Sequence, residues 1–469
     1  MVSGVHVRTL AAGLATLALA TGMAKAQETV AITNVTVISM AGTGQTSSRT
    51  VLVRDGRIAQ IGPSSVIQVP PDARVVDGSR KFLIPGLFDM HVHTSKTRAS
   101  ALGLYVVHGV TTVRDQGSEH AEVLRWRREI RAGERVGPRM LIAGPYLESR
   151  RNIERMRADP PESRVEPFER SRIPVGSPEE ARRVVDSLAA LELDHLKVRT
   201  IQDRATYVAL GQAARARGLR LTGHVVSSSP AALLEAGQSG VDHPFLVQPD
   251  SLPAATRMAF WRELAARDVG VVPTLVVLRE SVLRPQAYFD SLVADATPTR
   301  LVHPLRPYLS RFLILDWREQ AREQTPQRRA AFENFWPWIL NQVREMRAAG
   351  VRIMAGSDVA VLNIFPGLSL HQELEYLADS VGMSPAEALA SATRVPAEWL
   401  GIADSVGTIE AGKLADLVLL DANPLVDISY TQRIAAVMLR GRLFERRDLE
   451  ELLGAVRSMP DIRVNDWVR

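Results

Sequence analysis

Short apolar runs rich in β-branched residues alternate with amphipathic segments from Pro85 to about Ala403. This alternation is typical of repeated strand–helix units that build a parallel sheet. The runs that qualify as strands are residues 83–93, 109–115, 139–145, 195–199, 220–226, 240–245, 269–277 and 351–358. Two helix starts between strands, Ser177-Pro178 and Ser384-Pro385, each combine a capping serine, a proline at the first helical position and a Glu that can close a capping box. We therefore predict an α/β fold with a (β/α)8 TIM barrel, whose chemistry gathers at the C-terminal ends of the strands.

Two turn-rich, strand-like regions flank the barrel. Residues 29–76 include a hairpin signal at Asp55-Gly56, and residues 407–441 hold short apolar runs separated by glycine turns. We predict that the two regions pair into one β-sandwich domain. The predicted division is a signal peptide at 1–26, a composite β-sandwich domain at 27–84 and 405–469, and the (β/α)8 barrel at 85–404. Two long insertions, 148–176 and 279–336, follow the third and seventh strands and would lie over the barrel mouth.

The N-terminus has the pattern of a secretory signal. Arg8 precedes an apolar stretch at 10–23, and Ala24-Lys25-Ala26 is a small-x-small cleavage site. A membrane anchor is the alternative, but the stretch is shorter than the ~20 residues that a spanning helix needs. We expect a cut after Ala26, a periplasmic or secreted mature protein, and no membrane attachment after cleavage.

Composition narrows the chemistry. The chain contains no cysteine, which excludes disulfides, thiolate metal ligands and cysteine nucleophiles. Its formal net charge is +5, yet arginines stand beside acids, as in Arg127-Arg128-Glu129. This pattern indicates a solvated surface, and we do not infer nucleic-acid binding. Any metal ion must be held by histidines, carboxylates or a rarer ligand.

His91-Val92-His93 follows the first apolar run. Two histidines at i and i+2 on a strand project to the same face, so both imidazoles can reach one metal ion. Ordinary polar contacts are the alternative for such a pair. Further residues with metal-binding chemistry sit at or near later strand ends, which favours a metal site; they are Lys197, His224, His243 and Asp358.

With these residues in place, the chain resembles the amidohydrolase superfamily, in particular its imidazolonepropionase-like branch that includes Xaa-Pro dipeptidases. The resemblance runs from the flanking β region through the motif at 85–93 to Gly407-Thr408-Ile409 and the strand at 415–418. It implies that His91, His93 and Asp358 bind one divalent metal ion and that His224 and His243 bind a second. It also implies that Lys197, carboxylated on its amine by carbon dioxide, bridges the two.

The expected role of Lys197 is chemically reasonable. A carbamate is an anionic oxygen ligand, and arginine could not form one. The chain uses lysine sparingly, so a lysine within a buried strand calls for an explanation. The alternative is an ion pair with an interior acid such as Asp115 or Asp358. Zinc is the metal that we expect, although the same ligands suit manganese, iron or cobalt.

The expected reaction is hydrolysis of an amide or peptide bond in a small peptide or an N-acyl amino acid. Two metals ~3.5 to 4 Å apart lower the pKa of a shared water toward neutrality, so that hydroxide can attack the carbonyl carbon. Asp358 would accept the proton and return it to the leaving amine. A lactone, ester or cyclic-amide hydrolase is the alternative, while a deaminase is disfavoured because deaminase members usually lack the bridging lysine. The complete ligand set argues against a non-catalytic metal- or peptide-binding protein.

Substrate contacts are harder to predict. Arg114 ends the second strand, Tyr146 follows the third and Arg199 ends the fourth. An arginine at the mouth would suit a free carboxylate, although structural ion pairs or loop contacts are equal alternatives. Many dipeptidases of the branch carry a tyrosine two positions after the strand-five histidine, where this chain has Val226. That difference leaves the substrate side chains open. His371 is expected to support the site or its helix without binding metal, and the architecture is compatible with a homo-oligomer.

Overall fold

The computed structural model describes residues 28–42, 44–158, 170–225, 230–243, 253–294 and 303–459. The predicted signal peptide and Val226 lie outside these residues. Within the described part of the chain, no helix is both long enough and apolar enough to cross a membrane.

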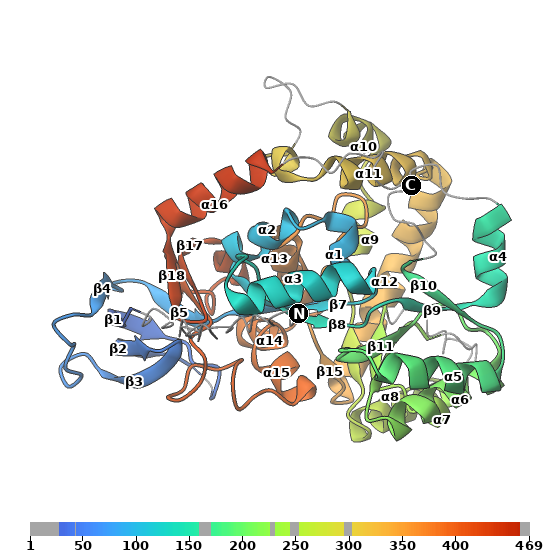
Figure 1. Cartoon of the computed structure of the whole chain (residues 1–469), viewed down its shortest axis with the longest axis horizontal. Coiled ribbons are helices and arrows are strands. Elements are labelled where there is room, and N and C mark those ends of the chain that lie inside the picture. The colour runs from blue at the N-terminus through green and yellow to red at the C-terminus, as the bar shows by residue number, and fades with distance from the viewer. Residues whose placement is uncertain are drawn as a thin grey trace, which may run out of the picture.

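A parallel strand forms within each predicted run (Figure 1), but the run at 269–277 is a strand only over Gly270–Val272 and becomes helix α9 (Leu275–Ser281), and the run at 351–358 is a strand only over Arg352–Ile353. One sheet has the order β6 (Leu87–Val92), β7 (Val110–Asp115) and β8 (Arg139–Ile142). The other has the order β10 (Arg172–Val175), β9 (Tyr146–Ser149), β11 (His195–Val198), β12 (Arg220–Gly223), β13 (Gly240–Asp242), β14 (Gly270–Val272) and β15 (Arg352–Ile353). Strands β9 and β10 are additions that the sequence pattern did not predict.

Backbone hydrogen bonds connect the two sheets at both ends. Asp194 N donates to Ile142 O over 2.9 Å, which links β8 to the start of β11. Met90 N donates to Ala355 O over 3.0 Å, and Val92 forms a parallel bridge with Val359, which link β6 to the segment after β15. The α/β fold is therefore consistent with the predicted barrel, in which the C-terminal ends of the strands share one side.

Helices follow most of the strands (Figure 1). Their bounds are α1 (Thr94–Thr97), α2 (Ala101–Val107), α3 (His120–Ala132), α4 (Arg150–Ala158), α5 (Pro178–Ala189), α6 (Arg204–Ala216), α7 (Pro230–Ala236), α8 (Ala254–Ala266), α9 (Leu275–Ser281), α10 (Gln286–Val293), α11 (Arg311–Arg322), α12 (Pro326–Ala348), α13 (Leu368–Glu375), α14 (Pro385–Ser391), α15 (Arg394–Leu400) and α16 (Arg446–Ser458).

Both predicted helix starts are confirmed, with one difference between them. Ser384 caps α14, and its partner Glu387 returns a bond to the Ser384 backbone N–H, which completes the capping box. Ser177 caps α5, but the Glu180 carboxylate accepts from Gly176 N instead, over 2.8 Å. At the start of α5 the Glu180 side chain therefore bonds to the backbone N–H of Gly176 and not to that of the capping Ser177.

The two ends of the chain meet in one sheet, as predicted. Its order is β18 (Arg442–Glu445), β17 (Ile434–Leu439), β16 (Leu417–Leu420), β5 (Phe82–Pro85), β1 (Val30–Val37), β2 (Thr46–Arg54) and β3 (Arg57–Pro63), with β4 (Arg74–Asp77) paired to β1. Strands β5 and β16 pair antiparallel and so join the N-terminal and C-terminal pieces. In Figure 1 the blue strands lie beside the red ones. The exact domain boundaries stay a prediction.

The chain passes from this sheet into the barrel at Gly86, which splits the first predicted strand into β5 and β6. Gly86 N donates to Asp416 O over 2.8 Å, and a Cβ at this position would collide with the Thr111 side chain. Only glycine fits such a close approach without displacing its neighbour.

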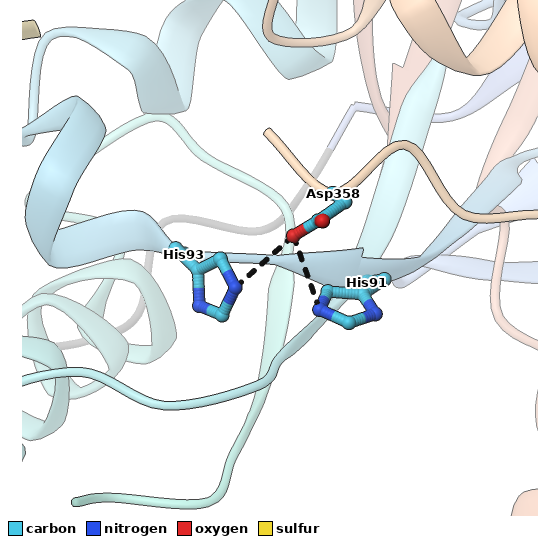
Figure 2. Close-up of side chains that lie close together, drawn as sticks. All are labelled: His91, His93 and Asp358. Carbon is cyan, nitrogen blue, oxygen red and sulfur yellow. Dashed lines mark ion pairs between the residues drawn. The ribbon is translucent and has the colours of Figure 1, made fainter. Parts of the chain in front are cut away.

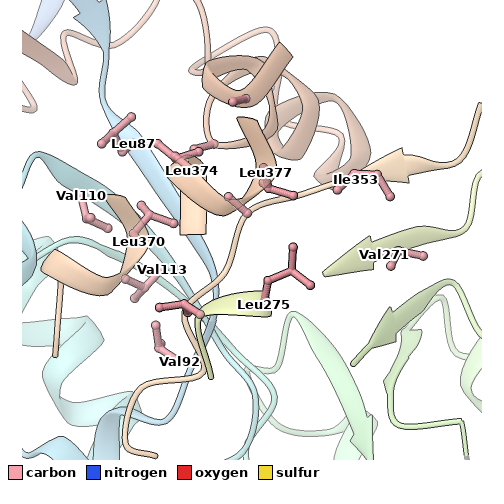
Figure 3. Packing of buried hydrophobic residues seen from close by; sticks show 14 of the residues in the cluster. Leu87, Val92, Val110, Val113, Val271, Leu275, Ile353, Leu370, Leu374 and Leu377 are labelled. Atoms are coloured by element: carbon pink, nitrogen blue, oxygen red, sulfur yellow. The ribbon is translucent and has the colours of Figure 1, made fainter. Parts of the chain in front are cut away.

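The main core lies between the barrel strands and the helices around them. Figure 3 shows Leu87, Val110 and Val113 of β6 and β7 packed near Leu370 and Leu374 of α13. A second cluster joins α10 and α11 to the loop after β15; it contains Phe289, Leu313, Trp317, Leu362 and Phe365. The second predicted insertion is therefore packed against the segment that follows the last barrel strand.

Candidate metal centre

The predicted histidine pair faces one carboxylate. His91 lies in β6 and His93 directly follows it, and both are buried. The Nε2 atom of His91 lies 3.2 Å from Asp358 Oδ1, and the Nε2 atom of His93 lies 3.1 Å from the same oxygen (Figure 2). One ligand atom from each residue falls within 4.8 Å of the others. This spacing is suited to binding one metal ion.

Backbone geometry fixes the carboxylate in place. Asp358 has φ of 56°, in the left-handed region that side chains rarely adopt, and its N–H donates to His91 O over 2.7 Å. The preceding Ser357 donates to the buried Asp89 carboxylate from its backbone N–H (2.9 Å) and its hydroxyl (2.5 Å). Strain of this kind persists only where surrounding contacts over-determine it, and it clusters at functional sites.

The remaining predicted histidines lie next to this group. His243, which follows β13, has φ of 55° and places its Nε2 atom 3.5 Å from Asp358 Oδ2. Its ring centroid lies 4.8 Å from that of His91 and 5.2 Å from that of His224, which follows β12. The four predicted histidines and Asp358 are therefore brought together at the C-terminal ends of the strands.

Contacts of the Nδ1 atoms of two histidines orient their Nε2 atoms toward Asp358. His93 Nδ1 lies 3.1 Å from Gly117 O and 2.9 Å from the Tyr146 hydroxyl. His243 Nδ1 lies 2.6 Å from Thr274 Oγ1, and that hydroxyl donates to Pro273 O over 2.8 Å, so it accepts from the histidine. Carbonyl and hydroxyl acceptors of this kind orient metal-binding imidazoles and fix their tautomer.

His91 provides a direct test of whether the site suits a metal. Both of its ring nitrogens are buried, and neither makes a well-formed hydrogen bond with a described residue: Nε2 faces Asp358 at 3.2 Å and Nδ1 faces Asp242 at 3.6 Å. Buried polar atoms are normally satisfied, so two such nitrogens beside Asp358 fit a metal ligand. Burial lowers the pKa of His91 to about 3 and lowers those of His224 and His243, so these rings are neutral, the form that binds metals.

Electrostatics favour an anionic Asp358. Burial alone would raise its pKa, but the electrostatic interactions with the His91 and His243 imidazoles and the hydrogen bond with His93 hold that pKa well below its usual range. A carboxylate among neutral imidazoles is the donor set that zinc and related divalent ions take.

Lys197 forms a buried ion pair. Its Nζ atom lies 2.6 Å from Asp242 Oδ2, while Asp242 Oδ1 accepts from Arg114 over 2.8 Å and lies 3.6 Å from His91 Nδ1. An ion pair is the alternative that we considered for Lys197, but the acid is neither Asp115 nor Asp358. Burial lowers the pKa of Lys197, although the negative charge of Asp242 acts in the opposite direction.

The sequence analysis missed Asp242. Asp242 ends the short buried strand β13, directly before His243. An acid in a buried strand requires an internal partner, and its place in such an apolar run was the one feature of the sequence that could have indicated its role. Asp115, in contrast, anchors the first turn after β6. Its Oδ2 accepts from Thr94 N over 2.7 Å and from Ser118 Oγ over 2.8 Å.

A cavity of about 150 Å³ opens beside the histidines. It is lined by His93, Lys96, Tyr146, Lys197, Arg199, His224, His243, Gln320, Asp358, Ala360 and Val361. Tyr146 and Arg199 thus occupy the predicted position at the site. Arg199 also pairs with the buried Glu148 over 3.3 Å. Lys96 and Gln320 were not anticipated, because a helical turn after a strand and an insertion helix carry no motif.

Arg114 corrects one expectation. It does not line the cavity; its guanidinium is buried and donates to Met90 O over 2.8 Å as well as to Asp242. Its position is that of a structural residue inside the barrel. His371 lies in α13 and contacts Thr431 Oγ1 (2.9 Å) and His108 O (3.0 Å), apart from the metal-binding group.

Comparison with known proteins agrees with this geometry. Residues 340–444 match the model of the Amidohydrolase family. An adenine deaminase from Paracoccus denitrificans is 36% identical over 77 residues, which is 16% of this chain and 13% of that protein. An imidazolonepropionase from Thermoplasma volcanium is 34% identical over 91 residues, which is 19% of this chain and 22% of that protein. The matched segments thus span under a quarter of these curated relatives.

Solved structures match over nearly the whole chain. A provisionally assigned prolidase from Bifidobacterium longum is 25% identical with a TM-score of 0.68, over 92% of this chain and 100% of that one. A Xaa-Pro dipeptidase with bound methionine is 22% identical with a TM-score of 0.65, over 89% and 100% of the two chains. The latter likeness concerns the fold alone. The family match over residues 340–444 and the whole-chain likeness to the Bifidobacterium longum protein therefore agree in pointing to the amidohydrolase superfamily.

Proposed function

We propose that this protein is an exported, metal-dependent amidohydrolase that hydrolyses the amide bond of a small peptide or an N-acyl amino acid. The observation that carries the proposal is the convergence of His91, His93 and Asp358 within 4.8 Å, with the nitrogens of His91 buried and making no well-formed hydrogen bond with a described residue. The match of residues 340–444 to the Amidohydrolase family supports the same chemistry.

Two divalent metal ions would be held by this constellation. His91, His93 and Asp358 would bind one, and His224 and His243 the other. Lys197, as a carbamate, would bridge them, and zinc is the metal that we expect. When bound, such ions polarise a carbonyl and activate water at neutral pH. In the alternative arrangement, Lys197 stays an amine paired with Asp242 and the site holds a single metal.

The residues themselves would handle the proton and the substrate. Asp358 is positioned to accept a proton from the attacking water and to deliver it to the departing nitrogen, because its carboxylate lines the cavity. Tyr146 orients His93 and faces the same space. Arg199 supplies positive charge at the opening, although Glu148 balances part of it.

A small substrate suits the cavity. Its volume of about 150 Å³ lies below the ~300 Å³ at which sites for drug-sized ligands begin. Among the similar structures, one prolidase is complexed with N-methylphosphonate-L-proline and one Xaa-Pro dipeptidase has bound methionine. These likenesses support an amino-acid-like ligand. Val226, in place of a tyrosine, argues against assuming Xaa-Pro specificity.

A second candidate is hydrolysis of a cyclic amide, a lactone or an ester in the same site. The sequence similarity to imidazolonepropionases favours keeping it, and the similarity to adenine deaminases extends the choice to deamination.

We further propose cleavage of the signal peptide after Ala26 and the domain division at residues 84–85 and 404–405. Assembly into a homo-oligomer is compatible with the fold.

The test is a turnover screen of the mature protein, residues 27–469, with zinc and bicarbonate. Dipeptides, including Xaa-Pro, N-acyl amino acids, cyclic amides and lactones would be compared between the wild type and Asp358→Asn. Hydrolysis of a linear amide that Asp358→Asn abolishes supports the proposal. Turnover of cyclic substrates alone favours the second candidate, and no metal-dependent turnover on any substrate contradicts both.

A further inference from the structure

We propose that Lys96 binds a carboxylate of the substrate and makes the enzyme selective for substrates that carry a carboxylate near the scissile amide. This inference rests on the proposed function, because it assigns the group that selects substrates in the same cavity. It is drawn from the position and the charge of one side chain that the sequence analysis did not single out.

Lys96 is presented to the cavity by a firmly held turn. It lies in α1, three positions after His93, where its neighbours Thr94, Ser95 and Thr97 are buried and Lys96 is not. The Asp115 carboxylate accepts from Thr94 N over 2.7 Å, and Ser95 N donates to Ser118 Oγ over 3.2 Å. The backbone that carries Lys96 is thereby tied to the end of β7.

The charge of Lys96 is unbalanced. The other cations that line the cavity have acidic partners outside it: Lys197 pairs with Asp242 at 2.6 Å and Arg199 with Glu148 at 3.3 Å. Lys96 forms no ion pair or hydrogen bond with any residue that the structure describes. A cationic side chain beside an enclosed site, with its partner position open, is suited to an anionic group of a ligand.

The choice of lysine is itself informative. The chain contains five lysines, and nearly all of its basic residues are arginine. Of the four in the described residues, Lys81 pairs with Asp421, Lys413 with Glu410 and Lys197 with Asp242. Lys96 therefore stands apart within the described part of the chain. Its compact ammonium stands on a flexible four-carbon stem and carries three donors that can turn toward a carboxylate.

The ligand chemistry is a carboxylate, and it could come from two sources. One is the terminal α-carboxylate of the residue released by hydrolysis. The other is the side chain of an aspartate or glutamate in the substrate. Both present the same two oxygens to an ammonium group, so the substrates chosen for the test must separate them.

The experiment compares the wild type with Lys96→Gln and Lys96→Arg, using the best linear amide substrate from the turnover screen in three forms. These are the free acid, its C-terminal amide, and a C-terminal amide with a glutamate side chain on the leaving residue. Lys81→Gln is the matched control, because it also removes a lysine charge but lies on the flanking β sheet, next to β5. Circular dichroism and a melting curve establish that each variant is folded.

We expect Lys96→Gln to lower kcat/KM for the free acid by about 10- to 100-fold, mainly through KM, as expected for the loss of a hydrogen bond to a charged group. The neutral amide should be unaffected, Lys96→Arg should retain part of the selectivity, and Lys81→Gln should match the wild type. An effect on the glutamate-bearing amide instead would identify the side-chain carboxylate. Equal losses on all forms, or none, would overturn the inference while the proposed function stands. No linear amide hydrolysis by the wild type would overturn the proposed function and this inference together.

Discussion

The ammonium of Lys197 lies 2.6 Å from the carboxylate of Asp242, and both side chains are buried inside the barrel. Asp242 also accepts from Arg114 over 2.8 Å, so one acid balances two buried cations. Removing one member of a buried ion pair leaves an uncompensated charge in a poorly solvating interior. The stability of the barrel interior therefore depends on whether Lys197 is a charged amine that pairs with Asp242.

We predict that, in the metal-free protein, where Lys197 is an amine, Asp242→Asn lowers the free energy of unfolding by about 3 to 5 kcal/mol, because Lys197 and Arg114 lose their shared counter-ion. Chemical denaturation, followed by circular dichroism, measures the change. Lys197→Met provides the comparison, since it removes a cation and leaves Asp242 paired with Arg114. A loss below about 1 kcal/mol in Asp242→Asn would contradict the role of Asp242 as counter-ion.

Thr274 is predicted to support metal binding without contacting the metal. Its hydroxyl accepts from His243 Nδ1 and so leaves Nε2 available toward Asp358. We expect Thr274→Ala to weaken metal affinity by about 10- to 100-fold, the usual range for loss of such a partner. Competition with a chelating dye measures it. Thr274→Ser keeps the hydroxyl and should stay near the wild type, so similar affinities in both variants would contradict the assignment.

Gln320 connects the insertion helix α11 to the loop that carries Asp358. Its Oε1 accepts from Leu362 N over 2.8 Å, and its neighbour Trp317 donates to Ala360 O over 3.0 Å. We predict that Gln320→Ala lowers kcat/KM about tenfold with unchanged metal content, because misplacement of reacting groups is costly even when the groups remain. Gln324→Ala, one turn further along the chain, is the control. Full activity of Gln320→Ala would show that α11 does not position this loop.

Glu373 gives a prediction about pH. Burial raises its pKa from 4.5 to about 8, and one carboxylate oxygen accepts from Val276 N over 2.8 Å. The folded state thus holds this proton more tightly than the unfolded state does. The stabilisation is complete below pH 4.5 and is lost as the pH rises toward about 8, by about 1.4 kcal/mol for each pH unit in that window.

Glu373→Gln should remove this part of the pH dependence, because glutamine is neutral at every pH and its carbonyl can still accept from Val276 N. Denaturation curves of the wild type and the variant at pH 5, 7 and 9 would measure the difference. The advantage of the variant should grow as the pH rises. A constant difference between the two proteins across this range would contradict a neutral, buried Glu373.

Local sequence patterns predicted much of the fold. Each predicted run contains a strand, although the second half of the run at 269–277 is helix α9, and the Asp55-Gly56 turn formed with both residues at positive φ, as a two-residue hairpin requires. Strands β9 and β10 escaped prediction because they are short and follow loop-like sequence. The joining of both chain ends was predictable from composition, whereas the pairing of β5 with β16 depends on tertiary contacts.

The candidate site was predictable where residues lie at strand ends. His91, His93, His224, His243 and Asp358 converge because the strands are parallel and end on one side. The orientation of the Arg114 side chain was not predictable. Successive residues of a strand point to opposite faces, and the sequence does not say which of them face the cavity at the mouth of the barrel. Asp242, Lys96 and Gln320 acquire their roles only through neighbours that are distant in sequence.

The central claim is a two-metal site bridged by Lys197, and metal content per chain tests it most directly. The mature protein would be loaded with zinc in the presence of bicarbonate, freed of excess metal, and measured by elemental analysis beside Lys197→Ala. The account predicts about two metals per chain in the wild type and one or fewer in the variant. One metal per chain in both proteins would contradict the bridged pair and favour an amine Lys197 that pairs with Asp242.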